Sequence, residues 1–156
     1  MNQKLSNWAS IAEIVSGVAV LVTLIFLIVG IRENTETVRA SSYDSILGEI
    51  NDMTLVVVQD ERLSQVWRKH AANADVELDE DEEWIMLALL RIVYRSYEKA
   101  YFARDSGTLG EVEYSRFARQ ACGHMNDPNA RDLWDEIASI LTEDYSAYVE
   151  ELCGLQ

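Results

Sequence analysis

The residues best suited to chemistry lie close together in an otherwise apolar stretch near the middle of the chain. Arg91, Arg95 and Glu98 recur at intervals of four and three residues, which places them on neighbouring turns of one helix. Tyr94 and Tyr97 are interleaved with them, and Tyr101 lies one turn beyond Glu98. Charges in so apolar a segment need partners. The group is therefore expected either to hold an anion or small ligand, or to form a structural ion pair that sets helix register, and ion pairs are the commoner arrangement.

The sequence does not place either histidine for metal binding or catalysis. His70 follows Arg68 and Lys69 at the end of an expected helix, where a cation interacts favourably with the helix dipole. His124 forms only a Cys-x-His pair with Cys122, two ligands short of a zinc site. The chain contains no Glu-x-x-His pair, no glycine-rich phosphate loop and no nucleophile elbow. We therefore expect no metal, no cofactor and no enzymatic activity.

The element that positions everything else is an uncharged run of eighteen residues, 14–31, close to the N-terminus. As a helix it would be roughly 27 Å long, close to the hydrocarbon thickness of a bilayer. A cleaved signal peptide would have a shorter apolar run, and a buried core helix would show a polar face. We predict a short tail at 1–7 and a transmembrane helix at 8–31.

Polar and aromatic residues flank the predicted span, and small residues recur within it. Expected membrane-interface residues are Trp8, Glu13, Arg32, Asn34 and Arg39. Glu13 is interpreted as interfacial rather than as a functional intramembrane carboxylate, because the cost of a charge is small at a helix end. Ala12, Ser16, Ala19 and Thr23 form a stripe along which a second helix could pack, so that these residues would serve oligomerisation.

Composition limits the partners of the remaining residues. The net charge of −14 lies entirely in residues 32–156, because Lys4 and Glu13 cancel within 1–31. Such a domain is repelled by phosphate backbones, so nucleic-acid binding through a basic patch is excluded. One positive residue precedes the span and two follow it closely, which favours a cytoplasmic C-terminal domain. The two cysteines, Cys122 and Cys153, are compatible with a reducing compartment.

Helical periodicity continues beyond the span. Apolar residues keep helical spacing over 43–57, and a short helix is expected around 63–70, followed by a loop at 71–78. A capping pair, Asp79 and Glu82, opens a helix that is apolar on two faces and that Gly107 ends. We expect this to be the central, most buried helix.

Two further helices complete the prediction. One ends at Gly123, and the last begins at Asp127 with proline in its first turn and runs to Gly154. The expected fold is all-α, with a single N-terminal transmembrane helix followed by a small helical bundle that forms one acidic domain at 32–156.

Several residues carry a family resemblance. Trp8 and Glu13 before the span, and the segment Ile31-Arg32-Glu33-Asn34-Thr35 after it, resemble the opening of a family of uncharacterised bacterial single-pass membrane proteins. Further similar positions are Glu98, Tyr101, Gly107, Leu109, Tyr114 and Trp134. Family members often carry Gln in place of Gly30 and Trp in place of Tyr114. The resemblance implies the single-pass topology and a bacterial origin, hence an inner-membrane location, and a role for Arg32 and Asn34 at the membrane exit, but no activity.

Three functions follow as hypotheses. The first is a membrane-anchored interaction and assembly protein that associates with itself in the bilayer. The alternative is a ligand-responsive membrane effector whose helical domain senses a small molecule and acts through the assembled spans. An enzyme with Glu98 as base beside Arg95 is retained only because catalytic sites can be assembled from residues distant in sequence. Expected partners are the lipid bilayer and further copies of the chain, and the identity of any small-molecule or other protein partner is left open.

Overall fold

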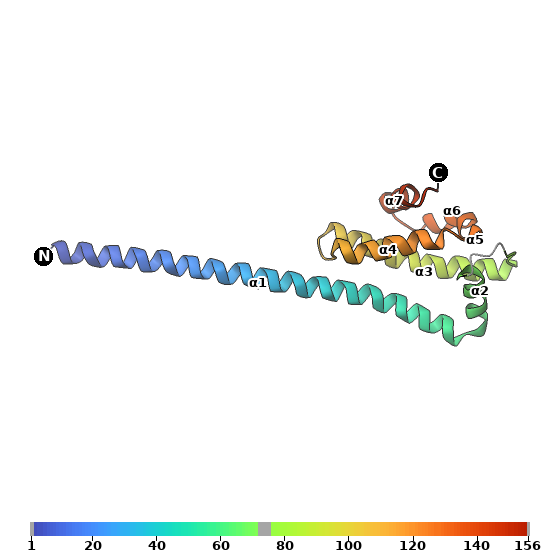
Figure 1. Ribbon diagram of the computed structural model, residues 1–156, viewed down its shortest axis with the longest axis horizontal. Coiled ribbons are helices and arrows are strands. Elements are labelled where there is room, and N and C mark those ends of the chain that lie inside the picture. Colours follow the sequence, from blue (N-terminus) through green and yellow to red (C-terminus); the bar gives the residue numbers. More distant parts are fainter. Residues whose placement is uncertain (1, 72–75, 156) are drawn as a thin grey trace. The chain divides into compact units, whose positions relative to one another are not determined.

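A computed structural model of the chain describes residues 2–71 and 76–155, with side chains described at 13 and from 15 onward. Among these residues the regular secondary structure is entirely helical, with no strand, so the predicted all-α fold is confirmed. The helices, labelled in Figure 1, are α1 (Asn2–Gln59), α2 (Glu61–Ala71), α3 (Glu80–Asp105), α4 (Glu111–His124), α5 (Pro128–Asp132), α6 (Trp134–Ala138) and α7 (Glu143–Cys153).

The chain divides into two compact units, Met1–Val38 and Arg39–Gln156. The first unit consists of the N-terminal part of α1. Its side chains are exposed throughout 15–38, as expected for a helix that has no protein around it. Within α1 the segment that begins at Val15 is long and apolar enough to cross a membrane.

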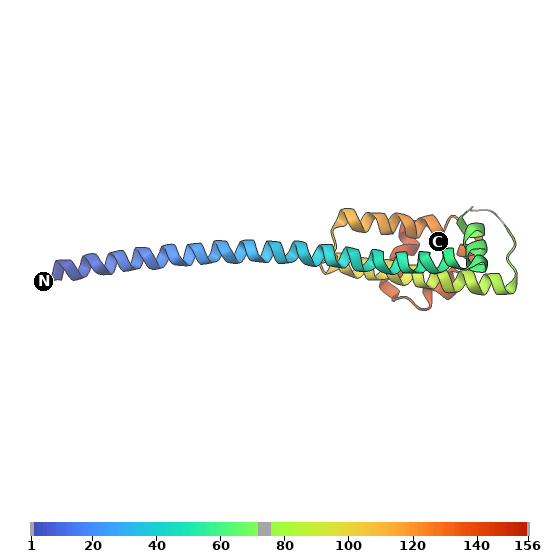
Figure 2. The same cartoon turned by 90° about the horizontal axis from the view of Figure 1, so that it is seen from below.

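The second unit, which we call the helical domain, is built around α3. The C-terminal part of α1 and the whole of α4 lie alongside α3, as Figures 1 and 2 both show. Helix α3 is central as predicted, because α2, α4, α5 and α6 all pack against it. Its buried side chains form one broad face rather than the two expected, and Trp84 and Ile92 are exposed. The largest fully buried side chains of the domain are Tyr94, Tyr145, Phe117, Ile46, Met86 and Leu90.

Local sequence signals set most helix ends. Asp79 accepts a hydrogen bond from the backbone N–H of Glu82, whose carboxylate accepts one in return, so the expected capping box is present. Asp127 caps α5 through the N–H of Asn129. Gly154 ends α7 in the left-handed region at φ 65°, a conformation that favours glycine.

The last predicted helix is not continuous, and this expectation was wrong. The apolar stripe from Leu133 onward is divided among α5, α6 and α7. Glu98 of α3 accepts a hydrogen bond from the backbone N–H of Thr142 at 2.6 Å, which supplies an acceptor at the start of α7. A carboxylate at a helix N-terminus also stabilises the helix dipole. The chain can therefore begin a new helix there and still bury Ile137 and Tyr145.

Candidate functional site

A chain of hydrogen-bonded polar side chains crosses the interior of the helical domain. Asp127 is fully buried and lies 2.6 Å, Oδ2 to Nδ1, from His70, which is 3% exposed. His70 Nε2 lies 2.8 Å from His124 Nδ1. His124 Nε2 lies 3.2 Å from the hydroxyl oxygen of Tyr97. We call these four residues the polar relay.

Four separate elements supply the members of the polar relay. His70 lies in the last turn of α2 and His124 in the last turn of α4, so the C-terminal ends of two helices meet. Tyr97 lies in the second half of α3. Asp127 is the N-cap of α5 and uses its other oxygen for the cap, at 3.1 Å from the backbone nitrogen of Asn129. One buried carboxylate thus both starts a helix and holds a histidine.

The protonation of the relay follows from its chemistry. A carboxylate only accepts hydrogen bonds, so His70 carries a proton on Nδ1 facing Asp127. Burial, assisted by the neighbouring His70, lowers the pKa of His124 to about 4, which leaves this ring neutral at pH 7.

Burial raises the pKa of Tyr97, so its hydroxyl stays protonated. Tyr97 can then donate to His124 Nε2, and His124 can donate from Nδ1 to His70. Each ring nitrogen of the two histidines thus has a hydrogen-bonding partner within the relay.

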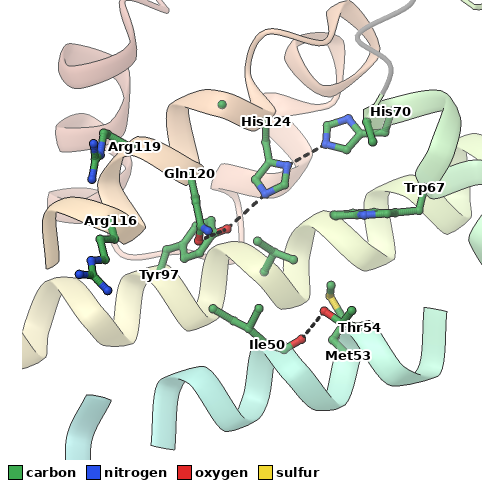
Figure 3. Close-up of a pocket in the computed structure, with 13 residues that line it drawn as sticks. Ile50, Met53, Thr54, Trp67, His70, Tyr97, Arg116, Arg119, Gln120 and His124 are labelled. Carbon is green, nitrogen blue, oxygen red and sulfur yellow. Dashed lines mark hydrogen bonds between the residues drawn. The ribbon is translucent and has the colours of Figure 1, made fainter. Parts of the chain in front are cut away.

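The relay forms part of the wall of a pocket of about 720 Å³ in the helical domain, which we call the relay pocket. Figure 3 shows Tyr97, Gln120 and His124 at this wall and Trp67 beside His70. Apolar side chains of α1, among them Ile50 and Met53, complete the lining. The pocket therefore joins a broad apolar surface to a buried polar wall, which is the usual composition of a small-molecule site.

The charge at the relay pocket is opposite to that of the domain. Arg116 and Arg119 of α4 line it, and among the described residues that line it there is no aspartate or glutamate. Arg116 Nη1 lies 3.3 Å from the hydroxyl of Tyr43, and Arg119 Nε donates to the carbonyl of Ser115 at 3.3 Å. In the part of the chain that the structure describes, neither guanidinium forms an ion pair with a carboxylate.

The five residues expected to form a ligand site or an ion pair have separate surroundings. Arg91 donates to the backbone carbonyl of Glu136, and Arg95 lines an exposed groove between α1 and α3. Tyr94 is buried and donates to the carbonyl of Ala121. Glu98 caps α7 as described above.

The remaining member of that group, Tyr101, belongs to a stacked cluster. The guanidinium of Arg104 lies over the rings of Tyr101, Tyr114 and Tyr148, at 4.7, 4.3 and 5.5 Å from their centroids. The group expected around Arg91 to Tyr101 thus serves packing between helices in the described structure rather than one shared pocket.

Sequence reasoning missed the polar relay. His70 does lie at a helix C-terminus as expected, but its ring faces the core rather than solvent. Its partners are 54 and 57 residues away in sequence. Asp127 was recognised only as a cap, because capping is its local function and nothing in the sequence reveals a second partner for its carboxylate.

The two cysteines also differ from the expectation of reduced thiols. Cys122 and Cys153 are joined by a disulfide that links the end of α4 to the end of α7, with 5.1 Å between their Cα atoms. The Cys-x-His pair is thereby accounted for without a metal, since Cys122 bonds Cys153 and His124 bonds His70. No cluster of metal-ligating side chains occurs among the residues that the structure describes.

The predicted span residues are placed as follows. Ser16, Ala19 and Thr23 are exposed, and the Thr23 hydroxyl donates to the carbonyl of Ala19 at 2.9 Å. Glu13, Arg32 and Asn34 are exposed as well, whereas Arg39 donates to the carbonyl of Gly107 at 3.1 Å. The side chains of Trp8 and Ala12 lie outside those that the structure describes.

No family model, curated protein or solved structure matches this chain. The bacterial family suggested by the residues around the span therefore stays an expectation. Functional inference depends on the geometry of the relay pocket.

Proposed function

We propose that this chain is a membrane-anchored binding protein whose helical domain holds a small molecule in the relay pocket. The observation that carries the proposal is the position of the polar relay at the wall of a pocket of about 720 Å³. The presence of this pocket favours the ligand-responsive effector over a protein that serves assembly alone.

The relay is more elaborate than helix packing needs. Capping α5 uses one oxygen of Asp127, and the other oxygen contacts His70. From His70 the hydrogen bonds continue to His124 and then to Tyr97. Burying polar groups costs free energy unless every one is paired, so buried polar networks are unusual and often mark functional sites. Here the network ends at the pocket, on Tyr97 and Gln120.

The anchor and the pocket share one helix. Helix α1 contains the apolar span and also contributes Ile50, Met53 and Thr54 to the pocket lining. This supports a role in which occupancy of the pocket is linked to the membrane helix. We propose a bacterial inner membrane as the location, on the strength of the family resemblance alone.

Filling the pocket tests the proposal. Gly123 lines it, and a Cβ added there would meet no atom within 4 Å, so Gly123→Leu should occupy pocket space without distorting the helix. Gly48→Leu is the matched control, because Gly48 is equally unobstructed, is helical and is not among the lining residues. Leucine also favours a helix over glycine, so both variants should fold.

Two probes are used, 2-naphthoate and 2-naphthamide. Their binding to the full-length protein in phosphatidylcholine nanodiscs is measured by ligand-observed NMR, with empty nanodiscs as the baseline. We expect at least one probe to bind the wild type and Gly48→Leu alike, and to bind Gly123→Leu at least about tenfold more weakly. Equal binding to all three proteins, or binding to none, would contradict the proposal.

The disulfide bears on orientation. The charge count favours a cytoplasmic domain, but it depends on only three basic residues. Disulfides persist in oxidising compartments and are rare in the cytosol. Because the only two cysteines of the chain are paired with each other, we propose instead that the helical domain lies on the oxidising side of the membrane.

Orientation is measured with two C-terminal fusions in a bacterial host. Alkaline phosphatase is active only outside the cytoplasm, and green fluorescent protein exported by the general secretory route fluoresces only inside it. We expect an active phosphatase fusion and a dark fluorescent fusion. The opposite pattern would restore the orientation inferred from charge.

Self-association through the span is a second candidate property. It is supported by the small exposed side chains at Ser16, Ala19 and Thr23, which would let two helices approach closely in lipid. Light scattering of full-length protein in detergent should give a defined oligomer, and Ala19→Ile should dissociate it. A monomer in the wild type would refute the idea.

A further inference from the structure

The relay pocket gathers positive charge in a strongly acidic domain. The chain carries 27 aspartates and glutamates against 13 lysines and arginines, yet the pocket lining has two arginines and, among the described residues, no acid. Three other grooves of the domain each contain at least one acidic residue beside an arginine, and a fourth is lined by Lys99 without an acid. The charge of the relay pocket is therefore a local property.

Both arginines are available to a ligand. Arg116 and Arg119 are exposed, and their recorded contacts are a tyrosine hydroxyl and a backbone carbonyl, both neutral. They are three residues apart on α4. Arg119 also lines a second groove, which contains Glu111, so Arg119 lies between that groove and the relay pocket. Guanidinium groups bind carboxylate and phosphate through charge-assisted hydrogen bonds, which are stronger than hydrogen bonds between neutral groups.

The rest of the lining suits the other end of such a ligand. Trp67 is half-buried in the lining, its ring 5.1 Å from that of His70 and 5.5 Å from that of His124, centroid to centroid. Ile50, Met53 and Val93 add aliphatic surface. Aromatic rings and thioethers pack well against flat apolar groups. Gln120, which like the arginines belongs to α4, contributes an amide to the same lining.

Resting on the proposed function, we infer that the relay pocket selects small organic anions: molecules with one carboxylate or phosphate group on a flat apolar body. Arg116 and Arg119 bind the anionic group, and the surface around Trp67 and Met53 packs against the body. At pH 7 His124 is neutral and Tyr97 stays protonated, so these two relay members carry no charge beside the ligand.

The same two probes distinguish a preference for anions from the mere existence of a binding site. 2-Naphthoate is an anion at pH 7, and 2-naphthamide is a neutral molecule of nearly the same shape. We expect the anion to bind the wild type at least about tenfold more tightly, because hydrogen bonds between two charged groups are stronger than those to a neutral amide. The preference should shrink as salt is added.

Arg116→Gln and Arg119→Gln, alone and together, should weaken naphthoate binding and leave naphthamide binding unchanged. The control is Arg68→Gln, which makes the same change in net charge at an exposed position of α2 outside the pocket lining and should alter neither. Naphthyl phosphate, used in parallel, separates phosphate from carboxylate ligands.

Equal binding of acid and amide by the wild type would overturn the anion inference and leave the proposed pocket function intact. Unchanged naphthoate affinity in the double variant would also overturn it. Failure of both probes to bind any protein would remove the proposed function itself.

Discussion

The titration of His124 gives the sharpest quantitative prediction. In the folded domain its pKa is lowered from 6.5 to about 4, mainly by burial. Between these values the unfolded chain binds a proton that the folded chain does not, so the free energy of unfolding falls as the pH falls. At about 1.4 kcal/mol per pKa unit, the full difference corresponds to about 3 kcal/mol, lost between about pH 6.5 and pH 4.

Urea unfolding of the full-length protein in detergent micelles, followed by tryptophan fluorescence, measures this dependence. Carboxylates also titrate in this range, so the informative quantity is the difference between the wild type and His124→Gln. Glutamine keeps a polar group but does not ionise, and the variant should be less stable at pH 7 because relay hydrogen bonds are lost. Its stability should fall by about 3 kcal/mol less than that of the wild type on acidification.

A parallel pH dependence in the two proteins would refute the reasoning. It would mean that His124 is accessible to solvent and titrates normally, and that the polar relay is not closed in solution.

Three further predictions concern the helical domain. Reduction of the disulfide, or Cys122→Ser, should lower the free energy of unfolding by about 3–4 kcal/mol for a loop of this length. Urea unfolding with and without reductant measures the difference. Equal stability in the two conditions would show that the cysteines are unpaired. Glu98→Ala should cost about 1 kcal/mol by removing the acceptor at Thr142, and Glu98→Gln should recover part of it; equal losses would contradict the capping role. Arg104→Met should cost about 1–2 kcal/mol by removing the cation from three tyrosine rings, and no loss relative to Arg68→Met would exclude that contribution.

Features encoded over a few residues could be predicted from the sequence. The uncharged run at 14–31 specifies an apolar helix, because apart from Ser16 and Thr23 it contains only apolar residues and glycine. The Asp79 and Glu82 box, the Asp127 cap and the left-handed Gly154 each depend on groups within four residues of one another. Such signals are local, so they hold whatever the rest of the chain does.

The division of the last helix was decided by tertiary structure. Its apolar stripe has the period of one long helix, and no glycine or proline interrupts it between Pro128 and Gly154. A continuous helix past Ile140 competes with a hydrogen bond to a distant residue. In that hydrogen bond the carboxylate of Glu98 accepts from the backbone N–H of Thr142. Helical periodicity records which residues are apolar, but it does not record which distant group caps a turn.

The functional site was also decided by tertiary structure. His70 and Asp127 are 57 residues apart, and only the packing of α2 and α4 against α3 brings them to 2.6 Å. The same packing closes the disulfide and gathers Arg116 and Arg119 beside an apolar pocket. Sequence alone determined that the chain is an acidic helical protein with one apolar helix. The fold determined where its few buried polar groups meet, because such groups must find partners once water is excluded.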